Sequence, residues 1–312
     1  MAANSLLKQY SDERAALVQN AVSKAAAIVL GRRRVLSGIR WRDDLIITAA
    51  EAIGGVEQAD VRLEGDELEA HVIATDLTTD IAVLRIASAT SAAHAIESNA
   101  GGANAADATT SLLRVGETIA VVGRTLRGPT AIWGAVQLAG PAWSSRRGGK
   151  IDQRIELDVG FDPSFEGAAV IDTSGNIVAM AVPGPSHRVL GIPTATIESV
   201  VAKVDQFGHL PKPYIGIRLQ PLWLDDDTRT KLGRKARGIA AVGGIDAGSP
   251  AEQAHIELGD LLLTLDGQPA ESVNDMASRI ASATPGQTIT LEVLRGGKPL
   301  TIDVQIGERP RH

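Results

Sequence analysis

Residues 44–53, DLIITAAEAI, join an apolar run to a polar side chain, and this stretch decides how the rest of the chain is interpreted. The run DLIITAA is rich in aliphatic and β-branched residues over the length of a short strand. A catalytic side chain can be presented where such a strand stops. The residue at that place is Glu51, although a base with a pKa near 7 would transfer protons better at neutral pH.

Composition describes an ordinary globular protein of two or three domains. The chain has 312 residues, of which 44% are hydrophobic and 22% charged. Aromatic residues make up 3%, which argues against base stacking, and the net charge of −6 gives no general attraction for phosphate backbones. The basic clusters GRRR (31–34) and SSRRGGK (144–150) are interpreted as solvated hairpin tips. We therefore expect no nucleic-acid partner.

Cysteine is absent, so disulfides, zinc–thiolate sites and cysteine nucleophiles are excluded. Charges at Lys8, Asp12, Glu13, Arg14 and Lys24 interrupt any apolar run long enough for a signal-peptide core or a membrane span. The chain as written is interpreted as cytoplasmic, or as periplasmic if a signal segment has been removed.

The first part of the chain predicts one helix and a small barrel. Residues 11–28 repeat apolar positions at helical spacing behind a Ser11 cap. Short β-branched segments then predict a six-stranded barrel over about 26–87: AAIVLG, VLSGIRW, DLIITAA, ADVRLEG, LEAHVIATD and DIAVLRI.

A second barrel and a third unit follow. Residues 88–110, rich in Ala, Ser, Asn and Gly, are expected to form a linker. A further strand series over about 111–205 closes with a helix at TIESVVAKV, and GHLPKPY (208–214) marks a domain boundary. In the last hundred residues, Ser272 and Asp275 predict a capping box ahead of MASRIASA, and two strands meet at the turn GGKP.

These units resemble the HtrA/Deg family of trypsin-like serine proteases, in which a chymotrypsin-like domain precedes a C-terminal PDZ domain. LSGIRWRDDLIITAA is similar to the family's catalytic histidine segment, TDIAVLRI to its aspartate segment, and VGETIAVVGRT to the first strand of its second barrel. GAAVIDTSGNIVAM resembles the hairpin after the nucleophile, and VLGIPTATIESVVAKV the end of that barrel. The resemblance implies a mainly β fold: a double β-barrel over 1–207 and an α+β PDZ domain over 211–308.

The PDZ resemblance implies a peptide-binding site. YIGI, Tyr214 to Ile217, is similar to the carboxylate-binding loop, and GSPAEQAHIELGDLLLTLDGQPAES to the PDZ core, except that His255 stands where glycine is usual. The amides of Ile215, Gly216 and Ile217 would bind a terminal carboxylate, and the peptide would add as a strand beside GIRLQ. An apolar pocket is expected from three helix residues, although the first and last of them could equally fill the core: Met276, Ala277 and Ile280.

The resemblance also implies that the catalytic residues are missing. Glu51 aligns with the histidine and Asp80 with the orienting acid. The family's Gly-Asn-Ser-Gly-Gly-Pro signature aligns with residues 164–169, which puts Glu166 at the nucleophile and Ser164 at an oxyanion position. A carboxylate cannot form an acyl-serine intermediate, and none of the six histidines, at 71, 94, 187, 209, 255 and 312, falls on the motif.

Three arrangements of the carboxylates of Glu51, Asp80 and Glu166 stay open. Two charges about 4 Å apart repel by roughly 4 kcal/mol at an effective dielectric of 20, so something must relieve the repulsion. The side chains splay into solvent or bond to amides, one carboxyl shares a proton with another, or a hard cation such as calcium or magnesium binds between them.

The function expected from the sequence is a catalytically inactive pseudoprotease that binds peptides or protein C-termini through its PDZ domain, without a cofactor. The alternative is a serine-type endopeptidase or other hydrolase with a rearranged or acidic site at Glu51, Asp80 and Glu166, which could depend on a cation. The resemblance further implies assembly into a trimer or with active relatives, for which Leu6, Leu7 and Tyr10 could supply an apolar contact.

Overall fold

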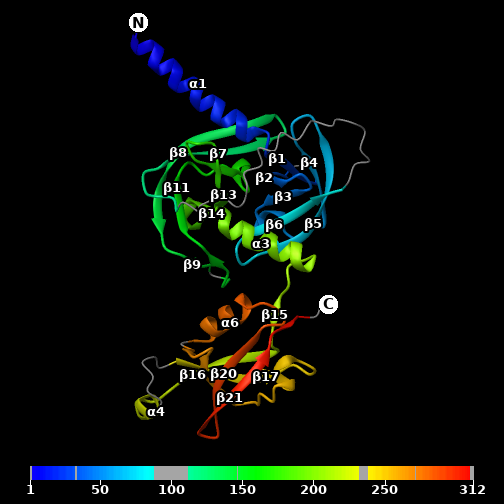
Figure 1. Ribbon diagram of the computed structural model, residues 1–312, viewed down its shortest axis with the longest axis vertical. Helices are drawn as coiled ribbons and strands as arrows, with labels where there is room; N and C mark the ends of the chain where they lie inside the picture. Colours follow the sequence, from blue (N-terminus) through cyan, green and yellow to red (C-terminus); the bar gives the residue numbers. More distant parts are fainter. Residues whose placement is uncertain are drawn as a thin grey trace. The chain divides into compact units, whose positions relative to one another are not determined.

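The computed structural model describes residues 2–31, 34–87, 112–145, 147–231, 238–270 and 272–309. The chain divides into two compact units, one of Met1–Ser145 with Lys150–Leu210 and one of Pro211–His312 with Arg146–Gly149 (Figure 1). The predicted linker over 88–110 lies outside the described residues.

The first six strands of unit 1 close into a barrel in the order β1-β2-β3-β6-β5-β4, which confirms the predicted barrel. The apolar side chains that predicted these strands are now its core, with Ile28, Ile39, Ile46 and Leu84 fully buried. A one-turn helix, α2 (Ala50–Ile53), follows β3. The strands are β1 (Ala25–Leu30), β2 (Arg34–Arg42), β3 (Leu45–Thr48), β4 (Gln58–Arg62), β5 (Glu67–Asp76) and β6 (Ile81–Ile86).

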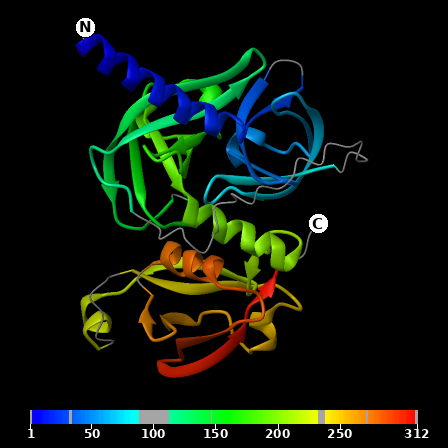
Figure 2. The same ribbon diagram turned by 45° about the horizontal axis from the view of Figure 1, so that its top comes forward.

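The predicted N-terminal helix was wrong at both ends. Helix α1 runs over Ala2–Val22, so Ser11 lies inside it and caps nothing. Residues 25–28 belong to β1, where Ala27 and Ile28 pair with β2 on one side and β4 on the other. Figures 1 and 2 show the N-terminal part of α1 extending beyond the barrels of its own unit.

The second barrel closes in the order β11-β14-β13-β12-β7-β8, again as predicted. Helix α3 (Thr194–Phe207) follows it and buries Ile197, Val200, Val201 and Val204. A two-stranded hairpin, β9 (Trp143–Ser144) with β10 (Lys150–Ile151), and two 3₁₀ turns, η1 (Pro163–Phe165) and η2 (Pro185–His187), interrupt the barrel sequence. Its strands are β7 (Thr118–Thr125), β8 (Gly128–Gly140), β11 (Arg154–Asp158), β12 (Ala169–Ile171), β13 (Ile177–Pro183) and β14 (Val189–Pro193).

Unit 2 is an antiparallel sheet with one main helix. The sheet order β16-β17-β18-β20-β21 leaves β16 at an edge, while β19 pairs with β18 and β15 with β22. Helix α6 (Val273–Ser282) has the predicted cap, since the Asp275 amide donates to Ser272 Oγ at 3.1 Å. The strands are β15 (Pro213–Tyr214), β16 (Ile217–Trp223), β17 (Gly238–Ile245), β18 (Leu261–Leu265), β19 (Gln268–Pro269), β20 (Thr288–Arg295), β21 (Lys298–Gln305) and β22 (Gly307–Glu308), and the short helices are α4 (Asp226–Lys231) and α5 (Pro250–Gln253).

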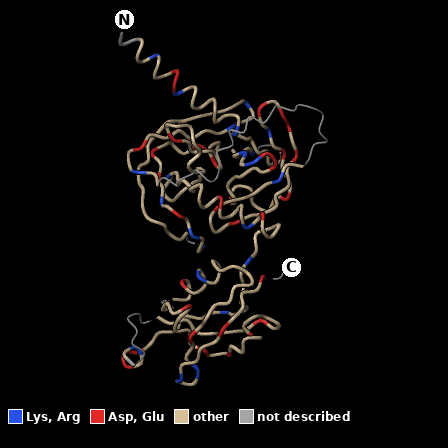
Figure 3. The backbone as a smooth tube through the Cα atoms, in the orientation of Figure 1, with Lys and Arg blue, Asp and Glu red and all other residues tan. Residues whose placement is uncertain are grey.

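Charges of both signs are interspersed along each unit, as the blue and red segments of Figure 3 show. Within the residues that the structure describes, no helix is long and apolar enough to cross a membrane.

Candidate functional site

Asp80 and Glu51 meet where the loop after β5 returns to the barrel. Antiparallel pairing of β3 with β6 sets Thr48 opposite Ala82, which brings the start of α2 beside Asp80. The Glu51 amide donates to Asp80 Oδ1 at 2.7 Å, and the Ala50 amide donates to the Asp80 carbonyl at 3.3 Å. Asp80 thus bonds to a backbone amide, one of the arrangements that the sequence left open.

Burial raises the pKa of Asp80 to about 6. The hydrogen bond from the Glu51 amide opposes this rise, whereas the negative charges of Glu51 and Glu166 add to it. An imidazolium beside Asp80 would lower its pKa, so the raised value follows from burial together with the carboxylates that stand nearby.

Glu166 lies between η1 and β12, with 11% of its side chain exposed. Its carbonyl accepts from the Ser37 amide at 3.0 Å, and its Oε2 lies 3.7 Å from Arg34 Nη2. Burial raises the pKa of Glu166, the charge of Arg34 opposes that, and the charge of Glu51 adds to it. Arg34, which the sequence placed in a solvated cluster, is therefore the counter-ion of Glu166.

The backbone amides around Glu166 are bonded to groups of the second barrel. The Ser164 amide donates to Asp162 Oδ1 at 2.8 Å, and the Glu166 amide to the Pro163 carbonyl at 3.3 Å. The Gly167 amide donates to the Ala181 carbonyl at 2.9 Å. An oxyanion needs amides that point at it with hydrogens unclaimed. In this arrangement the Ser164 amide is not available to an oxyanion, because it donates to Asp162. The sequence alone did not indicate this role of Asp162.

Gly167 holds the segment close to the first barrel. Its φ is +83°, and a Cβ there would lie 2.3 Å from Thr48 Oγ1 and 2.4 Å from the Ser37 carbonyl. The Ser37 hydroxyl donates to the Ser164 carbonyl at 2.5 Å. These contacts tie the loop of Glu166 to β2 and β3 within unit 1.

Among the residues that the structure describes, no histidine is among the groups that shift the pKa of Asp80. His71 is exposed on β5, with Nε2 3.7 Å from Glu69 Oε1, as a histidine on a strand face would be. His187 and His255 occupy turns with positive φ, and His94 and His312 lie outside the described residues.

The cation hypothesis finds no support in the described part of the chain. There, no group of three or more His, Cys, Asp or Glu side chains lies close enough together to hold a metal ion. Glu51, Asp80 and Glu166 influence one another's charge, but the structure does not assemble them into a metal site.

Replacing Asp80 by Asn tests this electrostatic description. Because the folded pKa is about 6 and the unfolded value about 3.9, stability falls as pH rises from 4 to 6 and stays reduced above 6. Asp80→Asn keeps the acceptor for Glu51 and suits the φ of 60°. We expect it to stabilise unit 1 by about 2 kcal/mol at pH 8 and by little at pH 4. Denaturant unfolding at both pH values checks this, with the exposed Asp66→Asn as control; equal effects at both pH values would contradict it.

In unit 2, the loop before β16 presents backbone amides. Gly216 has φ +83°, and the carbonyls of Ile215 and Gly216 accept from the Ala251 and Asp246 amides, both at 2.8 Å. Within the described residues, the amides of Ile215 and Gly216 themselves donate to no protein group. The loop is thus held by its carbonyls while two N–H groups stay available beside the open edge of β16.

Three side chains of α6 were expected to line the pocket beside this edge. Met276 is fully buried in the core of unit 2, which is the alternative that the sequence left open for it. Ile280 also packs in that core, with 9% exposed. Ala277 is exposed and stays a candidate groove residue. The turn spacing of a helix explains the split, because neighbours along α6 face different sides.

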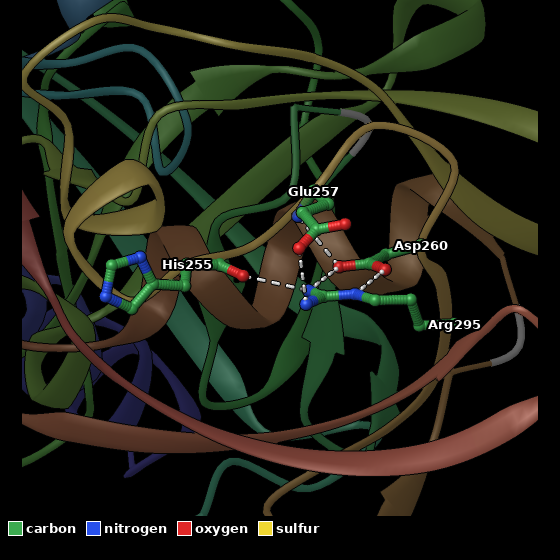
Figure 4. Close-up of polar contacts among 4 residues, drawn as sticks. All are labelled: His255, Glu257, Asp260 and Arg295. Carbon is green, nitrogen blue, oxygen red and sulfur yellow. Dashed lines mark hydrogen bonds and ion pairs between the residues drawn. The ribbon is translucent and has the colours of Figure 1, made fainter.

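His255 takes the left-handed backbone that the family's glycine would adopt, with φ 57°. Arg295 holds this turn from β20: its Nη2 donates to the His255 carbonyl at 2.8 Å and its Nη1 to Glu257 at 2.9 Å (Figure 4). Arg295 also bonds both carboxylate oxygens of Asp260, at 2.8 and 2.7 Å. Asp260 is 1% exposed; burial alone would raise its pKa, but the bonds from Arg295 and the Glu257 amide hold the pKa below its usual value.

The positive φ of His255 predicts a stabilising substitution. His255→Gly should raise the unfolding free energy of unit 2 by about 1 kcal/mol, because glycine adopts this backbone without steric cost. Chemical denaturation of the full chain, followed by a probe in unit 2, measures it. Loss of stability would mean that the imidazole makes a contact that outweighs the backbone strain.

Comparisons with known proteins agree with this architecture. The sequence matches the trypsin-like peptidase domain over residues 36–180 and the PDZ domain over residues 213–306. It is 29% identical over 86% of its length to a probable periplasmic serine endoprotease DegP-like from Bartonella henselae, and 28% identical over 79% to one from Rhizobium meliloti. It covers 52% and 47% of these relatives, so the chain spans about half the length of the curated relatives that it matches.

Solved structures share the fold. The HtrA-type protease AlgW with a decapeptide is 21% identical and has a TM-score of 0.68, over 95% of this chain and 98% of that one. A serine endoprotease from Yersinia pestis is 23% identical, with a TM-score of 0.66 over 94% and 97% of the two chains. At these identities the likeness concerns the double barrel and the PDZ unit as folds.

Proposed function

Because the chain belongs to the HtrA family of trypsin-like, PDZ-containing proteins, we propose that it binds the C-terminal ends of peptides through its PDZ domain and does not cleave them. The observation that carries the binding half is the pair of amides at Ile215 and Gly216, which bond to no described residue and lie beside the open edge of β16. Oriented backbone amides in such a loop form an anion-binding nest, and an extended peptide can add to a free sheet edge.

The loss of cleavage is proposed from two side chains and one backbone amide. Glu51 and Glu166 supply carboxylates at the positions that the resemblance assigns to the base and the nucleophile, and the amide of Ser164 is bonded to Asp162. In subtilisin, removing the nucleophile or the base lowers turnover by about 10⁶. The curated relatives are named serine endoproteases, so this chain is proposed to keep the fold of that class without its reaction.

A library of octapeptides with random residues at the four C-terminal positions tests binding directly. The full chain should bind members with a free C-terminal carboxylate and lose at least about tenfold in affinity when the same peptides carry a C-terminal amide. Equal binding of both forms would contradict a carboxylate site.

Gly216→Ala should abolish binding in the same assay. A Cβ at Gly216 would lie 2.1 Å from Ser249 Cβ, and φ is +83°, so the loop must shift. Gly248→Ala is the matched control: it also has positive φ, +70°, but its Cβ would meet nothing within 4 Å. Similar loss of binding in both variants would point to a general effect on stability instead of a site at Gly216.

Helix α1 supports a second proposal, assembly with another chain. Leu6 and Leu7 are each 68% exposed and Tyr10 is 56% exposed, on a helix extending beyond its barrels. A homo-oligomer such as a trimer, or assembly with active relatives, would cover them. Replacing all three by Ser should lower the mass measured by sedimentation; an unchanged monomer mass before and after substitution would remove this proposal.

The compartment is also proposed. The relatives from Bartonella henselae and Rhizobium meliloti are named periplasmic, as is the DegQ endoprotease of Escherichia coli, which is 27% identical. These names favour the periplasmic interpretation and give the cytoplasmic one no support. A role in protein quality control would fit a protein of this family that holds chains without cutting them.

The acidic hydrolase remains the second candidate because one observation favours it: the pKa of Asp80, about 6, lies in the range where a carboxyl can exchange protons. Such an enzyme would show casein hydrolysis that depends on pH near 6 and is lost in Asp80→Asn. No detectable hydrolysis at any pH from about 5 to 8 would remove this candidate.

A further inference from the structure

Arg218 stands next to the amides of the proposed carboxylate loop and on the open edge of the sheet. It is the second residue of β16, which pairs with β17 on one side only. Ile217 and Leu219 are partly buried, whereas Arg218 and Gln220 are exposed, so the strand alternates between the side of the core and the outer side. Arg218 therefore projects on the face opposite the core.

The edge fixes which ligand residue lies opposite Arg218. A peptide whose terminal carboxylate occupies the amides of residues 215–217 must run antiparallel to β16, with its last residue near Ile217. Residues directly opposite in an antiparallel pair point to the same face. The penultimate ligand residue then lies opposite Arg218, and its side chain points to the same outer side.

Pro221 limits backbone pairing with β16 to the C-terminal residues of the peptide. Proline has no N–H, and it is tolerated in a strand where its nitrogen faces an open edge. The edge of β16 thus lacks a donor at Pro221, three residues beyond Arg218. Backbone pairing beyond that point is weakened, so discrimination depends on the side chains nearest the carboxylate loop.

The guanidinium of Arg218 lies near Asp246 without a hydrogen bond to it. The side chain is 71% exposed, and Nη1 lies 3.8 Å from Asp246 Oδ1, beyond hydrogen-bond distance. Asp246 is engaged elsewhere, since its Oδ2 accepts from the Tyr214 hydroxyl at 2.7 Å. Gly244 in β17 leaves space for the Arg218 side chain, because a Cβ at Gly244 would lie 2.4 Å from the Nε of Arg218.

We propose that Arg218 makes this PDZ domain select peptides with Asp or Glu at the penultimate position. The inference rests on the proposed peptide binding at the same loop and adds its charge preference. A carboxylate on the penultimate side chain would accept from the guanidinium donors that Asp246 leaves unused. Asp246 competes for the same cation, so it moderates the preference.

The experiment compares labelled octapeptides that end in Val and carry Glu or Gln as the penultimate residue, each with a free carboxylate and as the amide. Fluorescence anisotropy with the full chain should give about threefold tighter binding of the Glu peptide, a preference that weakens with salt. In Arg218→Gln the ratio of the two affinities should fall to about one, and in Asp246→Asn it should rise. The carboxamide oxygen that Asp246→Asn introduces would still accept from the Tyr214 hydroxyl.

Lys298→Gln is the matched control, since Lys298 is an exposed cation on β21, at the opposite edge of the sheet, and its removal should leave the ratio unchanged. Equal affinities for Glu and Gln peptides that both need a free carboxylate would overturn the charge preference and leave the proposed function standing. A preference that appears when Glu is moved to the fourth position from the end, and not at the penultimate one, would also overturn it. No difference between free and amidated peptides would overturn both.

Discussion

The double variant Glu51→His with Glu166→Ser should remain nearly inert toward a fluorophosphonate probe, and adding Asp162→Ala should raise its labelling rate by about 100-fold. The double change supplies a base and a nucleophile beside Asp80, but the Ser164 amide still donates to Asp162 at 2.8 Å. Loss of one oxyanion donor costs about 10²–10³ in rate. Removing the Asp162 carboxylate frees that amide. Labelling rates of the two purified variants measure the difference.

Asp172→Ala provides the control for this triple variant. Asp172 also accepts backbone amides in a turn, from Ser174 at 2.8 Å and Asn176 at 2.9 Å, but in the hairpin between β12 and β13. Combined with the double change, it should leave labelling as slow as before. Rapid labelling of the double variant alone would mean that the bonded loop of Ser164 is no obstacle to the reaction.

Replacing Arg295 by Met should destabilise unit 2 by about 3–5 kcal/mol. Asp260 is 1% exposed, and Arg295 donates to both of its carboxylate oxygens, so the variant leaves a buried charge without its partner. The substitution also removes the hydrogen bond from Arg295 to the carbonyl of His255, a residue with positive φ. Denaturant unfolding of the full chain, with a probe in each unit, measures whether unit 2 alone is affected.

Adding Asp260→Asn to this variant should recover part of the lost stability. The asparagine removes the uncompensated charge and keeps an acceptor for the Glu257 amide, which donates to Asp260 at 2.9 Å. Because the pKa of Asp260 is held low, wild-type unit 2 should also lose stability as pH falls below about 4, and Arg295→Met should lose less of it. A loss below about 1 kcal/mol in Arg295→Met at pH 7 would contradict the role given to this ion pair.

The barrels could be predicted from sequence because their strands alternate or repeat β-branched residues between clear turns. The N-terminal helix could not be bounded in this way, because Ala25, Ala26 and Ala27 suit a helix by propensity. In the fold they form the buried strand β1, paired on both sides with β2 and β4. The β4 partner lies outside the local stretch of sequence, so the local pattern does not contain this pairing.

The site was predictable in its residue types and less so in its contacts. Sequence placed Glu51, Asp80 and Glu166 together, and the structure brings their charges within mutual influence. The roles of Arg34 and Arg295 depend on ion pairs with Glu166 and Asp260, respectively. The partners in each pair are far apart in sequence, so residue spacing does not reveal the pair. The Asp-Pro-Ser order at 162–164 was a cap signal that could have been found. For Met276 the sequence left both groove and core open, because helical spacing alone does not tell which face of a helix lies on the core, and the residue is buried in the core.

The central proposal is that this chain binds peptides and does not cleave them. Incubating the purified full-length chain with a fluorophosphonate serine probe and with unfolded casein, beside an active serine endoprotease as control, tests it most directly. We predict that no serine is labelled and that casein stays intact from about pH 5 to 8. Labelling of any serine, or digestion that persists through repurification, would contradict it.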